Sequence, residues 1–455
     1  MKKEIRPNSF AFCGGAFGDE GKGRIVDEYV NTYSSNGHPV IVYRDNGGAN
    51  AGHTVELDDG RRIAMHLLPS GMLCSSAKVI LGKDMVIHPA DLLTEIYEVN
   101  ETAGPGNAAE IIIDEMSFLA LDTHRAYEAA LKDWQSGGNG ATGRGIGPAY
   151  ADILLRHPLR MKDITDFNAK KIIEHYELYQ ALLDGMGFKL EQTKVPLLCH
   201  EELYTVGGKY NFVEKLMAQG KTLKPLTSDV NSYLKKDWQD ENNVFIFEKA
   251  QAIGLDHRYG VYPDVTASDT TFEGIRSSTE GIVDPNQIEL RAAVIKATYM
   301  SSVGNRNLPT MMEEKWDTRI REDHKEFGAT TKRIRRIAHI DLPALRVFTS
   351  AGNINSLILT HMDCVYPDLP IKICTSYRLG REEVDYRPSQ EFLNQVTPEY
   401  IELPTWNRNA IQAARNYKEL PKEAKAYLDF MEANLGTKIT MITTGPQRNQ
   451  SIKIQ

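Results

Sequence analysis

The sequence predicts an α/β fold with a large, mostly parallel mixed sheet flanked by helices. Short apolar segments typical of buried strands alternate with segments of helical spacing in the first part of the chain. Strand-like segments return near the C-terminus, and no Pro/Ser-rich linker separates the two ends. A chain of 455 residues suits either two or three average domains or one large one. We expect one domain over residues 1–455, with a mainly helical insertion at about 120–240.

The predicted elements of the first part follow from apolar runs and their spacing. Strands are expected at residues 9–13, 40–44, 78–87 and 110–115, and helices at 25–33 and 91–101. Beyond the helical insertion, strands are expected at 244–251, 345–350, 371–379 and 437–445, and helices near 286–302 and at 422–436. The last of these helices is amphipathic and ends at a glycine, which is a common helix stop.

The composition is that of a globular protein, with 41% hydrophobic and 25% charged residues. The 35 Gly and 20 Pro follow no fixed period, which excludes collagen-like and low-complexity chains. Lys and Arg total 53 against 61 Asp and Glu, a formal net charge of −8. We therefore expect no nucleic acid and no membrane partner, and anionic ligands must be held by local basic clusters.

The cysteines and the apolar segments indicate a cytoplasmic protein. Five cysteines stand at long spacings without a CxxC pair, which is typical of reduced thiols. The N-terminal segment has no apolar run of the length that a signal peptide needs. No stretch approaches 18 apolar residues, so no membrane span is expected.

The first chemical motif is GDEGKG at residues 18–23, between a predicted strand and a predicted helix. Its glycines would let the backbone approach a phosphate, and the helix N-terminus would direct N–H groups at it. Lys22 adds a point charge, although the motif is not GxxxxGK[ST]. Asp19 and Glu20 would repel an anion, so one of them binds Mg²⁺ or removes a proton. The alternative is a tight glycine turn with solvated acids.

Two further glycine-rich loops contain candidate polar groups. In GGANAGHT (47–54), His53 could donate to a phosphoryl or carbonyl oxygen, although a lone loop histidine is more often structural. Asn50 in the same loop could equally be a turn residue. TGRGIGP (142–148) suggests another anion contact lined by backbone, or else a loop before an exposed basic helix face.

The second half of the chain contributes a basic loop and two polar strand ends. TTKRIRR (330–336) places four basic residues and two hydroxyls together, and arginine forks suit carboxylates and phosphates. A nucleic-acid patch is disfavoured by the acidic composition. THMD (360–363) and TTGPQR (443–448) are both interpreted as lying just after strands, and an Asp there could accept two N–H bonds from a base edge. Without context, these are ordinary loop residues.

Together these motifs resemble the adenylosuccinate synthetase family. GDEGKGRIVD, GGANAGHT, ATGRGIGPAYAD, FEKAQ with YPDVTASD, ATTKRIRR and TTGPQR occur in the family's order over residues 14–448. The resemblance implies the family's large mixed sheet, related to P-loop GTPases, and a homodimer. Family members join aspartate to C6 of IMP with GTP and Mg²⁺, through a 6-phosphoryl intermediate that makes the oxygen a good leaving group.

The resemblance also implies residue roles. Asp19 would be the general base and a Mg²⁺ ligand, and His53 would be the acid at the transferred phosphoryl group. The implied catalytic residues are Asp19, Lys22, His53 and Gln251, and the implied metal ligands are Asp19 and the carbonyl of Gly52. The implied purine nucleotide-binding residues are Asn50, Thr142, Arg156, Gln251, Thr266, Val303 and Arg333, with Arg156 crossing to the other subunit. The implied aspartate-binding residues are Thr330, Thr331, Arg333 and Arg335. The implied nucleoside triphosphate-binding residues are Gly18, Glu20, Gly21, Lys22, Gly23, His53, Thr54, His361, Asp363, Thr443 and Gly445.

Departures from the family pattern keep an alternative open. Lys332 stands where the family usually has glycine, and His361 stands where it usually has lysine before the base-reading Asp363. A phage-associated branch acts on dGMP, forms the 2-amino analogue of the product, and can use ATP. The His361 change favours that branch, whereas Asp19, which the branch often lacks, favours IMP. A non-catalytic relative is disfavoured because base, acid and carboxylate clamp are all retained.

Overall fold

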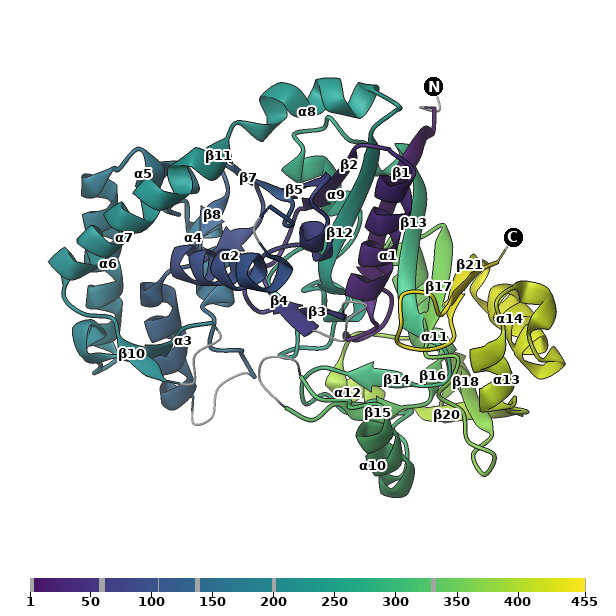
Figure 1. The fold of residues 1–455 in the computed structure, drawn as a ribbon. Helices are drawn as coiled ribbons and strands as arrows, with labels where there is room; N and C mark the ends of the chain where they lie inside the picture. The colour runs from purple at the N-terminus through teal and green to yellow at the C-terminus, as the bar shows by residue number, and fades with distance from the viewer. Residues whose placement is uncertain are drawn as a thin grey trace.

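A ten-stranded sheet runs through the centre of the molecule (Figure 1). The computed structural model describes residues 4–56, 62–104, 106–135, 140–198, 202–328 and 333–454. The strands are, in spatial order, β11 (Thr227–Ser228), β7 (Glu110–Asp114), β5 (Ala77–Leu81), β2 (Val40–Arg44), β12 (Val244–Ala252), β1 (Arg6–Gly14), β13 (Ile288–Lys296), β17 (Ser356–Thr360), β21 (Lys438–Thr443) and β22 (Ser451–Lys453). Neighbouring strands are parallel except β21 and β22, which are antiparallel. The predicted fold class is confirmed.

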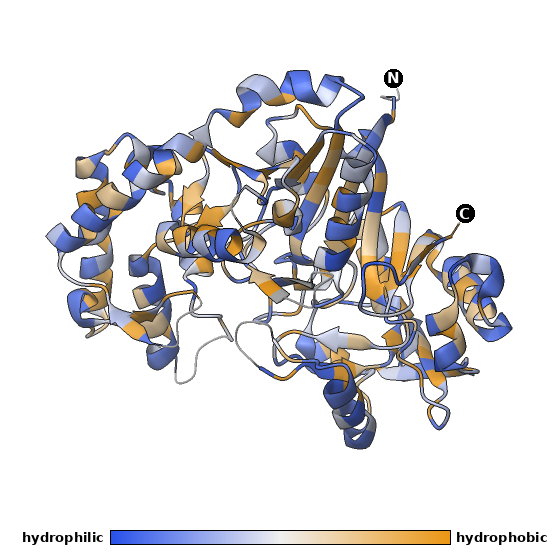
Figure 2. Cartoon of the chain, viewed as in Figure 1, coloured by the Kyte–Doolittle hydropathy of each residue, from blue (hydrophilic) through white to orange (hydrophobic). Residues whose placement is uncertain are grey.

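Helices cover both faces of this sheet. Successive residues of β1 point to opposite faces, so Phe10 and Phe12 join one buried cluster while Ala11 and Cys13 join the other. The first cluster includes buried residues of α1 (Lys22–Ser35) and α2 (Pro89–Ala103). The second includes those of α8 (Val230–Gln239), α11 (Leu342–Ala351) and α14 (Lys422–Leu435). Burial on both faces explains why the strands read as continuous apolar runs, which Figure 2 shows as orange strands.

Several helices stand together to one side of the sheet (Figure 1). They are α3 (Asp122–Trp134), α4 (Ile146–Leu155), α5 (Met161–Thr165), α6 (Ala169–Gly185) and α7 (Lys209–Leu223), with the short ladder of β9 (Lys194–Pro196) and β10 (Leu203–Thr205). Ile172 of α6 and Phe212 of α7 belong to the same buried cluster as Leu92 of α2, which joins this group to the sheet. The division of the chain into domains stays a prediction.

The remaining elements form smaller sheets and connections. Beside the main sheet lie β16 (Ile340–Asp341), β18 (Ile371–Leu379), β19 (Glu382–Val384) and β20 (Thr397–Leu403). Three pairs are formed by β3 (His53–Glu56) with β4 (Arg62–Met65), β6 (Val86–Ile87) with β8 (Phe118–Leu119), and β14 (Met300–Ser302) with β15 (Arg336–Ala338). The short helices are α9 (Glu273–Ser278), α10 (Glu314–Asp323), α12 (Gln390–Leu393) and α13 (Arg408–Ala413). In the described ranges, no helix is long and apolar enough to cross a membrane.

Three secondary-structure predictions are wrong in type or extent. The helix predicted near 286–302 is instead β13 followed by β14, because pairing with both β1 and β17 outweighs the helix propensity of its alanines. The strand predicted at 345–350 lies in α11, where Asp341 caps the N-terminus by accepting the Ala344 N–H at 3.2 Å. The run predicted at 78–87 divides into β5 and β6 at Gly82, whose N–H donates to the Arg44 carbonyl at 2.8 Å.

Candidate active site

The predicted motifs meet at one edge of the sheet because parallel strands present their carboxyl ends together. GDEGKG follows β1, and the loop with Asn50 follows β2. Gln251 lies near the end of β12, THMD follows β17, and TTGP begins at the end of β21. Segments more than 400 residues apart are thus neighbours: Arg24 in α1 donates to the carbonyl of Pro446 at 3.1 Å.

The loop between β1 and α1 has the backbone of an anion-binding turn. Gly18 (φ 102°), Asp19 (φ 61°) and Gly21 (φ 87°) all adopt left-handed conformations, which cost glycine little. Gly21 caps α1 without a side-chain hydrogen bond, so the first N–H groups of the helix are open to a ligand. A Cβ at Gly23 would lie 2.9 Å from Ser70 Oγ and 3.2 Å from His53 Cβ, so glycine lets α1 approach His53 closely.

Glu20 is folded into this loop. Its carboxylate accepts the N–H groups of Gly18 at 2.7 Å and Ala16 at 3.3 Å, and Lys22 Nζ donates to it at 3.2 Å. The Glu20 side chain is 2% exposed. Glu20 therefore stabilises the loop through these hydrogen bonds and fixes the position of the Lys22 ammonium group.

Asp19, unlike Glu20, pairs with a residue outside the loop, Arg335. Arg335 Nε donates to Asp19 Oδ2, and the Asp19 side chain is 36% exposed against 9% for Arg335. Arg333, two residues earlier, donates to the carbonyls of Gly140 at 3.1 Å and Ala141 at 3.4 Å. The basic segment therefore reaches both the phosphate loop and the loop that contains Thr142.

His53 contacts the buried carboxylate of Glu248. Its Nδ1 contacts Glu248 Oε1, and Glu248 also accepts the Ser70 N–H at 2.7 Å and the Ser70 hydroxyl at 2.8 Å. Burial lowers the pKa of His53, against the opposing charge of Glu248. A carboxylate can only accept, so Nδ1 donates and Nε2 is left for a ligand. Bringing an anionic phosphoryl group to Nε2 would favour the imidazolium, which Glu248 stabilises.

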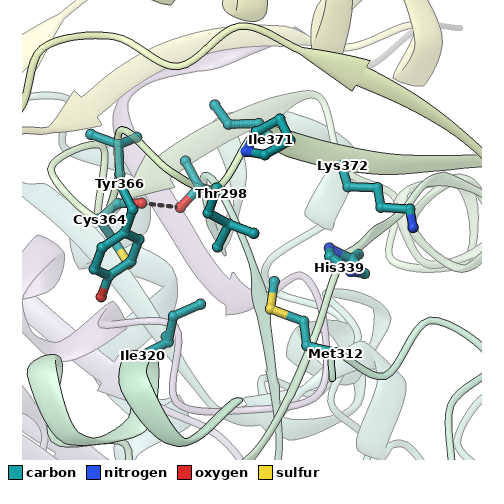
Figure 3. Close-up of a pocket in the computed structure, with 11 residues that line it drawn as sticks. Thr298, Met312, Ile320, His339, Cys364, Tyr366, Ile371 and Lys372 are labelled. Carbon is teal, nitrogen blue, oxygen red and sulfur yellow. Dashed lines mark hydrogen bonds between the residues drawn. The ribbon is translucent and has the colours of Figure 1, made fainter. Parts of the chain in front are cut away.

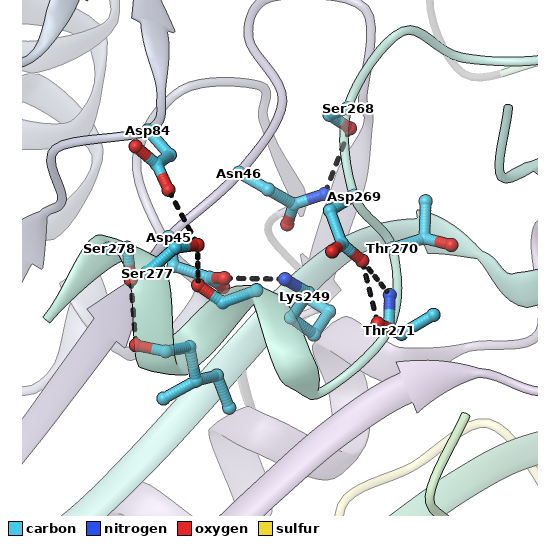
Figure 4. Close-up of polar contacts among 12 residues, drawn as sticks. Asp45, Asn46, Asp84, Lys249, Ser268, Asp269, Thr270, Thr271, Ser277 and Ser278 are labelled. Atoms are coloured by element: carbon cyan, nitrogen blue, oxygen red, sulfur yellow. Dashed lines mark hydrogen bonds and ion pairs between the residues drawn. The ribbon is translucent and has the colours of Figure 1, made fainter. Parts of the chain in front are cut away.

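Gln251 contacts Ser268, which belongs to a group of polar side chains with Asn46 (Figure 4 shows Ser268 and Asn46). It has φ 60°, and its Nε2 is buried without a hydrogen-bond partner among the described residues. Ser268 Oγ donates to Gln251 Oε1 at 3.4 Å and accepts from Asn46 Nδ2 at 3.0 Å. Asn46 Oδ1 accepts the Ala250 N–H at 2.9 Å. These hydrogen bonds fix the amide oxygen and leave Nε2 as a donor suited to an acceptor on a ligand.

The sequence neighbours of Ala250 and Asn46, which are Lys249 and Asp45, form a buried ion pair. Lys249 Nζ donates to Asp45 Oδ2, and both side chains are almost fully buried. Burial raises the pKa of Asp45 to about 6, although Lys249 opposes the rise. Thr266 Oγ1 is a second buried polar atom without a partner in the described part of the chain. Gln251 and Thr266 thus leave unmatched hydrogen-bonding groups where the purine-binding residues were predicted.

The ends of β17 and β21 carry a second group of polar residues. His361 has φ 59°, and its N–H donates to Thr443 Oγ1 at 3.2 Å. Burial lowers the pKa of His361 well below its usual range, so the ring is neutral. Asp363 accepts from Gln412 Nε2 at 3.2 Å, and Arg408 of the same helix lies 3.9 Å away. A carboxylate with neighbouring donors is suited to a base edge that both donates and accepts.

Comparisons with known proteins agree with this geometry. The sequence profile of the adenylosuccinate synthetase family matches residues 11–452. The chain belongs to the adenylosuccinate synthetase family. It is 33% identical over 454 residues to the adenylosuccinate synthetase of Clostridium perfringens, covering 98% of this chain and 99% of that protein. It is 34% identical over 448 residues to that of Chlorobaculum parvum, covering 96% of each.

Two solved structures bear on the fold. The fully ligated adenylosuccinate synthetase from Plasmodium falciparum superposes with a TM-score of 0.84 at 28% identity, covering 98% of this chain and 100% of that one. The cyanophage S-2L succinoaminodeoxyadenylate synthetase, bound to dGMP and dATP, superposes with a TM-score of 0.58 at 16% identity, covering 98% and 95%. The second likeness concerns the fold alone. Family membership is therefore confirmed, and the phage branch is a distant neighbour.

The Mg²⁺ predicted from the family pattern has suitable oxygen donors. Mg²⁺ prefers a few carboxylate or carbonyl oxygens together with phosphates and water. The half-exposed carboxylate of Asp19 and the exposed loop at Gly52 supply that donor set without a dedicated cage. These residues fit the metal.

Some predicted residues can be placed only in part. Thr330 and Thr331 lie outside the described residues, as does the side chain of Thr54. Val303 donates its N–H to the carbonyl of Phe17 at 3.1 Å, and so lies directly beside the phosphate loop. A Cβ at Gly445 would lie 2.3 Å from Gln450 Oε1, so a larger residue there would displace the Gln450 side chain.

Arg156 does not share the cluster just described. It ends α4 with φ 70°, beside Leu154 and Leu155, which are 84% and 66% exposed. These two adjacent apolar side chains make the end of α4 a candidate contact surface.

Two other candidate sites in the molecule have different explanations. His124, Asp152 and His175 have metal-like spacing, and all three are buried. However, His124 Nδ1 accepts the Leu121 N–H at 2.9 Å, so its Nε2 carries the proton that it donates to Asp152 at 2.9 Å. This cluster is a hydrogen-bond network of the helical region.

The cavity in Figure 3 is likewise not the active site. It is lined by residues that include Met312, His339, Cys364 and Lys372, and Thr298 Oγ1 donates across its wall to the Cys364 carbonyl at 2.6 Å. None of the predicted site residues lines it.

Sequence reasoning missed the residues that orient the predicted ones. Glu248, Ser70 and Ser268 were not singled out, although each contacts a predicted site residue. A signal was present for Glu248, because a carboxylate inside the apolar run VFIFEKAQ must have a buried partner. Ser70 and Ser268 have no such signal.

Proposed function

We propose that this chain joins L-aspartate to C6 of IMP with GTP as phosphate donor, giving adenylosuccinate, GDP and phosphate. Membership of the family supports the reaction type, which is a C–N ligation. The observation that carries the proposal is the arrangement around the phosphate loop. The half-exposed carboxylate of Asp19 follows β1, His53 with its partner Glu248 begins β3, and the unmatched amide of Gln251 lies near the end of β12.

The first step requires removal of a proton and charge neutralisation. Asp19 takes the N1 proton of the purine, so that the 6-oxygen can attack the γ-phosphate. Gln251 Nε2 donates to the 6-oxygen, and Nε2 of the protonated His53 donates to the transferred phosphoryl group. Lys22 and the N-terminus of α1 hold the phosphates. Mg²⁺, when held by Asp19 and the Gly52 carbonyl, supplies further neutralisation of the phosphate oxygens.

The second step requires a held nucleophile. Arginine forks bind carboxylates in a bidentate manner, so Arg333 and Arg335 grip the two carboxylates of aspartate. The aspartate amine attacks C6, and phosphate leaves with the electrons of the C6–O bond. Thr330 and Thr331 complete the proposed aspartate site from residues that the structure does not describe.

The proposed donor is GTP because of Asp363. Guanine presents an N1–H and a 2-amino group, both donors, to a carboxylate that can only accept. Adenine offers no such pair. The neutral His361 contributes no charge here, so base selection depends on Asp363, Thr443 and Gly445 in this proposal. We further propose a cytoplasmic homodimer in which Arg156 of each subunit completes the other's nucleotide site.

Aspartate-dependent phosphate release with Mg²⁺ tests this function. IMP and dGMP should each be offered with GTP and with ATP. Turnover with IMP and GTP is the expected result. Turnover confined to dGMP would contradict the proposed acceptor, and turnover equal with ATP and GTP would contradict the role of Asp363. The absence of aspartate-dependent turnover in all four mixtures would overturn the proposal.

A further inference from the structure

A closed series of polar contacts joins the phosphate loop to Arg335. It starts at Ser301 in β14, whose hydroxyl donates to the Gly18 carbonyl at 3.2 Å. The same hydroxyl accepts from Lys296 Nζ at 2.7 Å. Lys296 ends β13, so the contact ties the backbone of the phosphate loop to a central strand of the sheet.

Lys296 is paired with Glu326 in the interior. Lys296 Nζ and the hydroxyl of Tyr299 both donate to Glu326 Oε1, the latter at 2.5 Å. The two charged side chains are 3% and 5% exposed. Removing two charges from water largely offsets their attraction, so such a pair adds little net stability over apolar side chains that fill the same space. What it does provide is a fixed geometry.

The series closes through the backbone of Glu326. Its carbonyl accepts the N–H of Arg335 at 3.0 Å, and its N–H donates to the carbonyl of Arg321 at 2.9 Å. Arg335 in turn donates to Asp19, the residue that follows Gly18. Arg335 is therefore held at both ends: at its backbone by Glu326 and at its guanidinium by the phosphate loop.

We propose that Lys296 and Glu326 are positioning residues that set Arg335 relative to Asp19. They touch no substrate themselves. Through Arg335 they determine where the aspartate amine lies with respect to the activated C6, and through Ser301 they hold the loop that carries the base. The inference rests on the proposed function, because it assigns a geometric requirement to its aspartate site.

The test compares a double variant with a matched control. Lys296→Met with Glu326→Gln removes both charges and keeps an acceptor for Tyr299. The control, Asp91→Asn with Arg125→Met, removes another buried pair, whose side chains are both 0% exposed. That pair also contacts Pro196 and Leu198, in the helical region. Ser301→Ala is a milder variant that removes one contact and no charge.

Steady-state constants and thermal midpoints should be measured for all four proteins. The double variant is expected to raise KM for aspartate and lower kcat, each by about tenfold or more, because small displacements of a reacting group are costly. KM for IMP should stay within about twofold of the wild type, since a displaced Arg335 leaves the purine contacts in place. Ser301→Ala should change the same constants in the same direction but less.

Several outcomes would overturn the inference. One is a folded double variant with an unchanged KM for aspartate. Another is a control that raises this KM as much as the double variant does at an equal fall in thermal midpoint. If the double variant does not fold, an unchanged KM for aspartate in Ser301→Ala counts against the proposal. Turnover of the wild type with aspartate tests the proposed function separately, so the two failures are distinguishable.

Discussion

Arg335 donates its Nε–H to the carboxylate of Asp19, although 316 positions separate them in the sequence. The residue proposed to grip aspartate is therefore paired with the residue proposed to remove the N1 proton. This ion pair engages the guanidinium that is proposed to bind aspartate and the carboxylate that is proposed to accept the proton. In the proposed mechanism, substrate aspartate would compete with Asp19 for the guanidinium, and a metal ion at Asp19 would release Arg335.

Asp19→Asn separates these two effects. Turnover should fall by about 10²- to 10⁴-fold, because a neutral amide cannot accept the N1 proton. Aspartate binding in the presence of IMP should become about two- to fivefold tighter, since a half-exposed competing ion pair is lost. Phosphate release and calorimetric titration measure the two quantities. Undiminished turnover would remove Asp19 from the role of base, and weaker aspartate binding would contradict the competition.

Glu248→Gln tests the support of His53. The carboxylate stabilises the imidazolium that forms when a phosphoryl group meets Nε2, so its loss should lower kcat by about 10²-fold. It should also shift the pH profile of kcat to lower pH, because without Glu248 the protonated ring forms only in more acid solution. Ser70→Ala leaves the charge in place and serves as the control, with a loss below about tenfold. An unshifted profile in Glu248→Gln would contradict the assignment.

The sequence predicted the strands β1, β2, β5, β7, β12 and β21 of the main sheet because they read as continuous apolar runs. Prediction failed where propensity and tertiary context disagree. The alanines of β13 favour a helix, yet the strand fits between β1 and β17. Val347 and Thr349 favour a strand, yet a capped start at Asp341 makes α11 a helix.

The site was predictable as a set of motifs but not as a geometry. Residues with a family motif, such as Asp19 and Gln251, were identified by their place in it. Contacts between distant segments were not, because pairing of Asp19 with Arg335 depends on the strand order of the sheet. The hydrogen bond from Ser268 to Gln251 was equally unpredictable, because the sequence around Ser268 does not indicate its partner.

His339 should make the fold sensitive to mild acid. Burial lowers the pKa of His339 to about 4, and Lys372 beside it adds to the effect (Figure 3). The unfolded chain, with an ordinary histidine pKa of about 6.5, binds this proton first as the pH falls. The stability is therefore complete above pH 6.5 and is lost as the pH falls toward 4, by up to about 3 kcal/mol.

Denaturant unfolding at a series of pH values measures this effect. His339→Gln should show a smaller fall in the free energy of unfolding over that range than the wild type. His38→Gln, at a partly exposed histidine between α1 and β2, is the matched histidine control. Equal pH dependence in wild type and His339→Gln would show that other groups cause the acid sensitivity.

The end of α4 should determine whether the site is shared between subunits. Leu154 and Leu155 are exposed beside Arg156, so the proposed dimer covers all three. Arg156→Leu and Asp19→Asn should each be nearly inactive alone. In a heterodimer of the two, the subunit that retains Asp19 receives Arg156 from its partner, and one of the two sites is complete. Random mixing makes about half of the dimers heterodimers, so about a quarter of wild-type activity should return.

Leu154→Asp provides the matched control for this experiment. The added charge on the proposed interface should shift the protein toward the monomer in size-exclusion chromatography. When Leu154→Asp is added to both inactive variants, mixing them should no longer restore activity. Recovery that persists without dimers would contradict a shared site. Absence of recovery in a mixture with demonstrated subunit exchange would contradict a site shared between subunits.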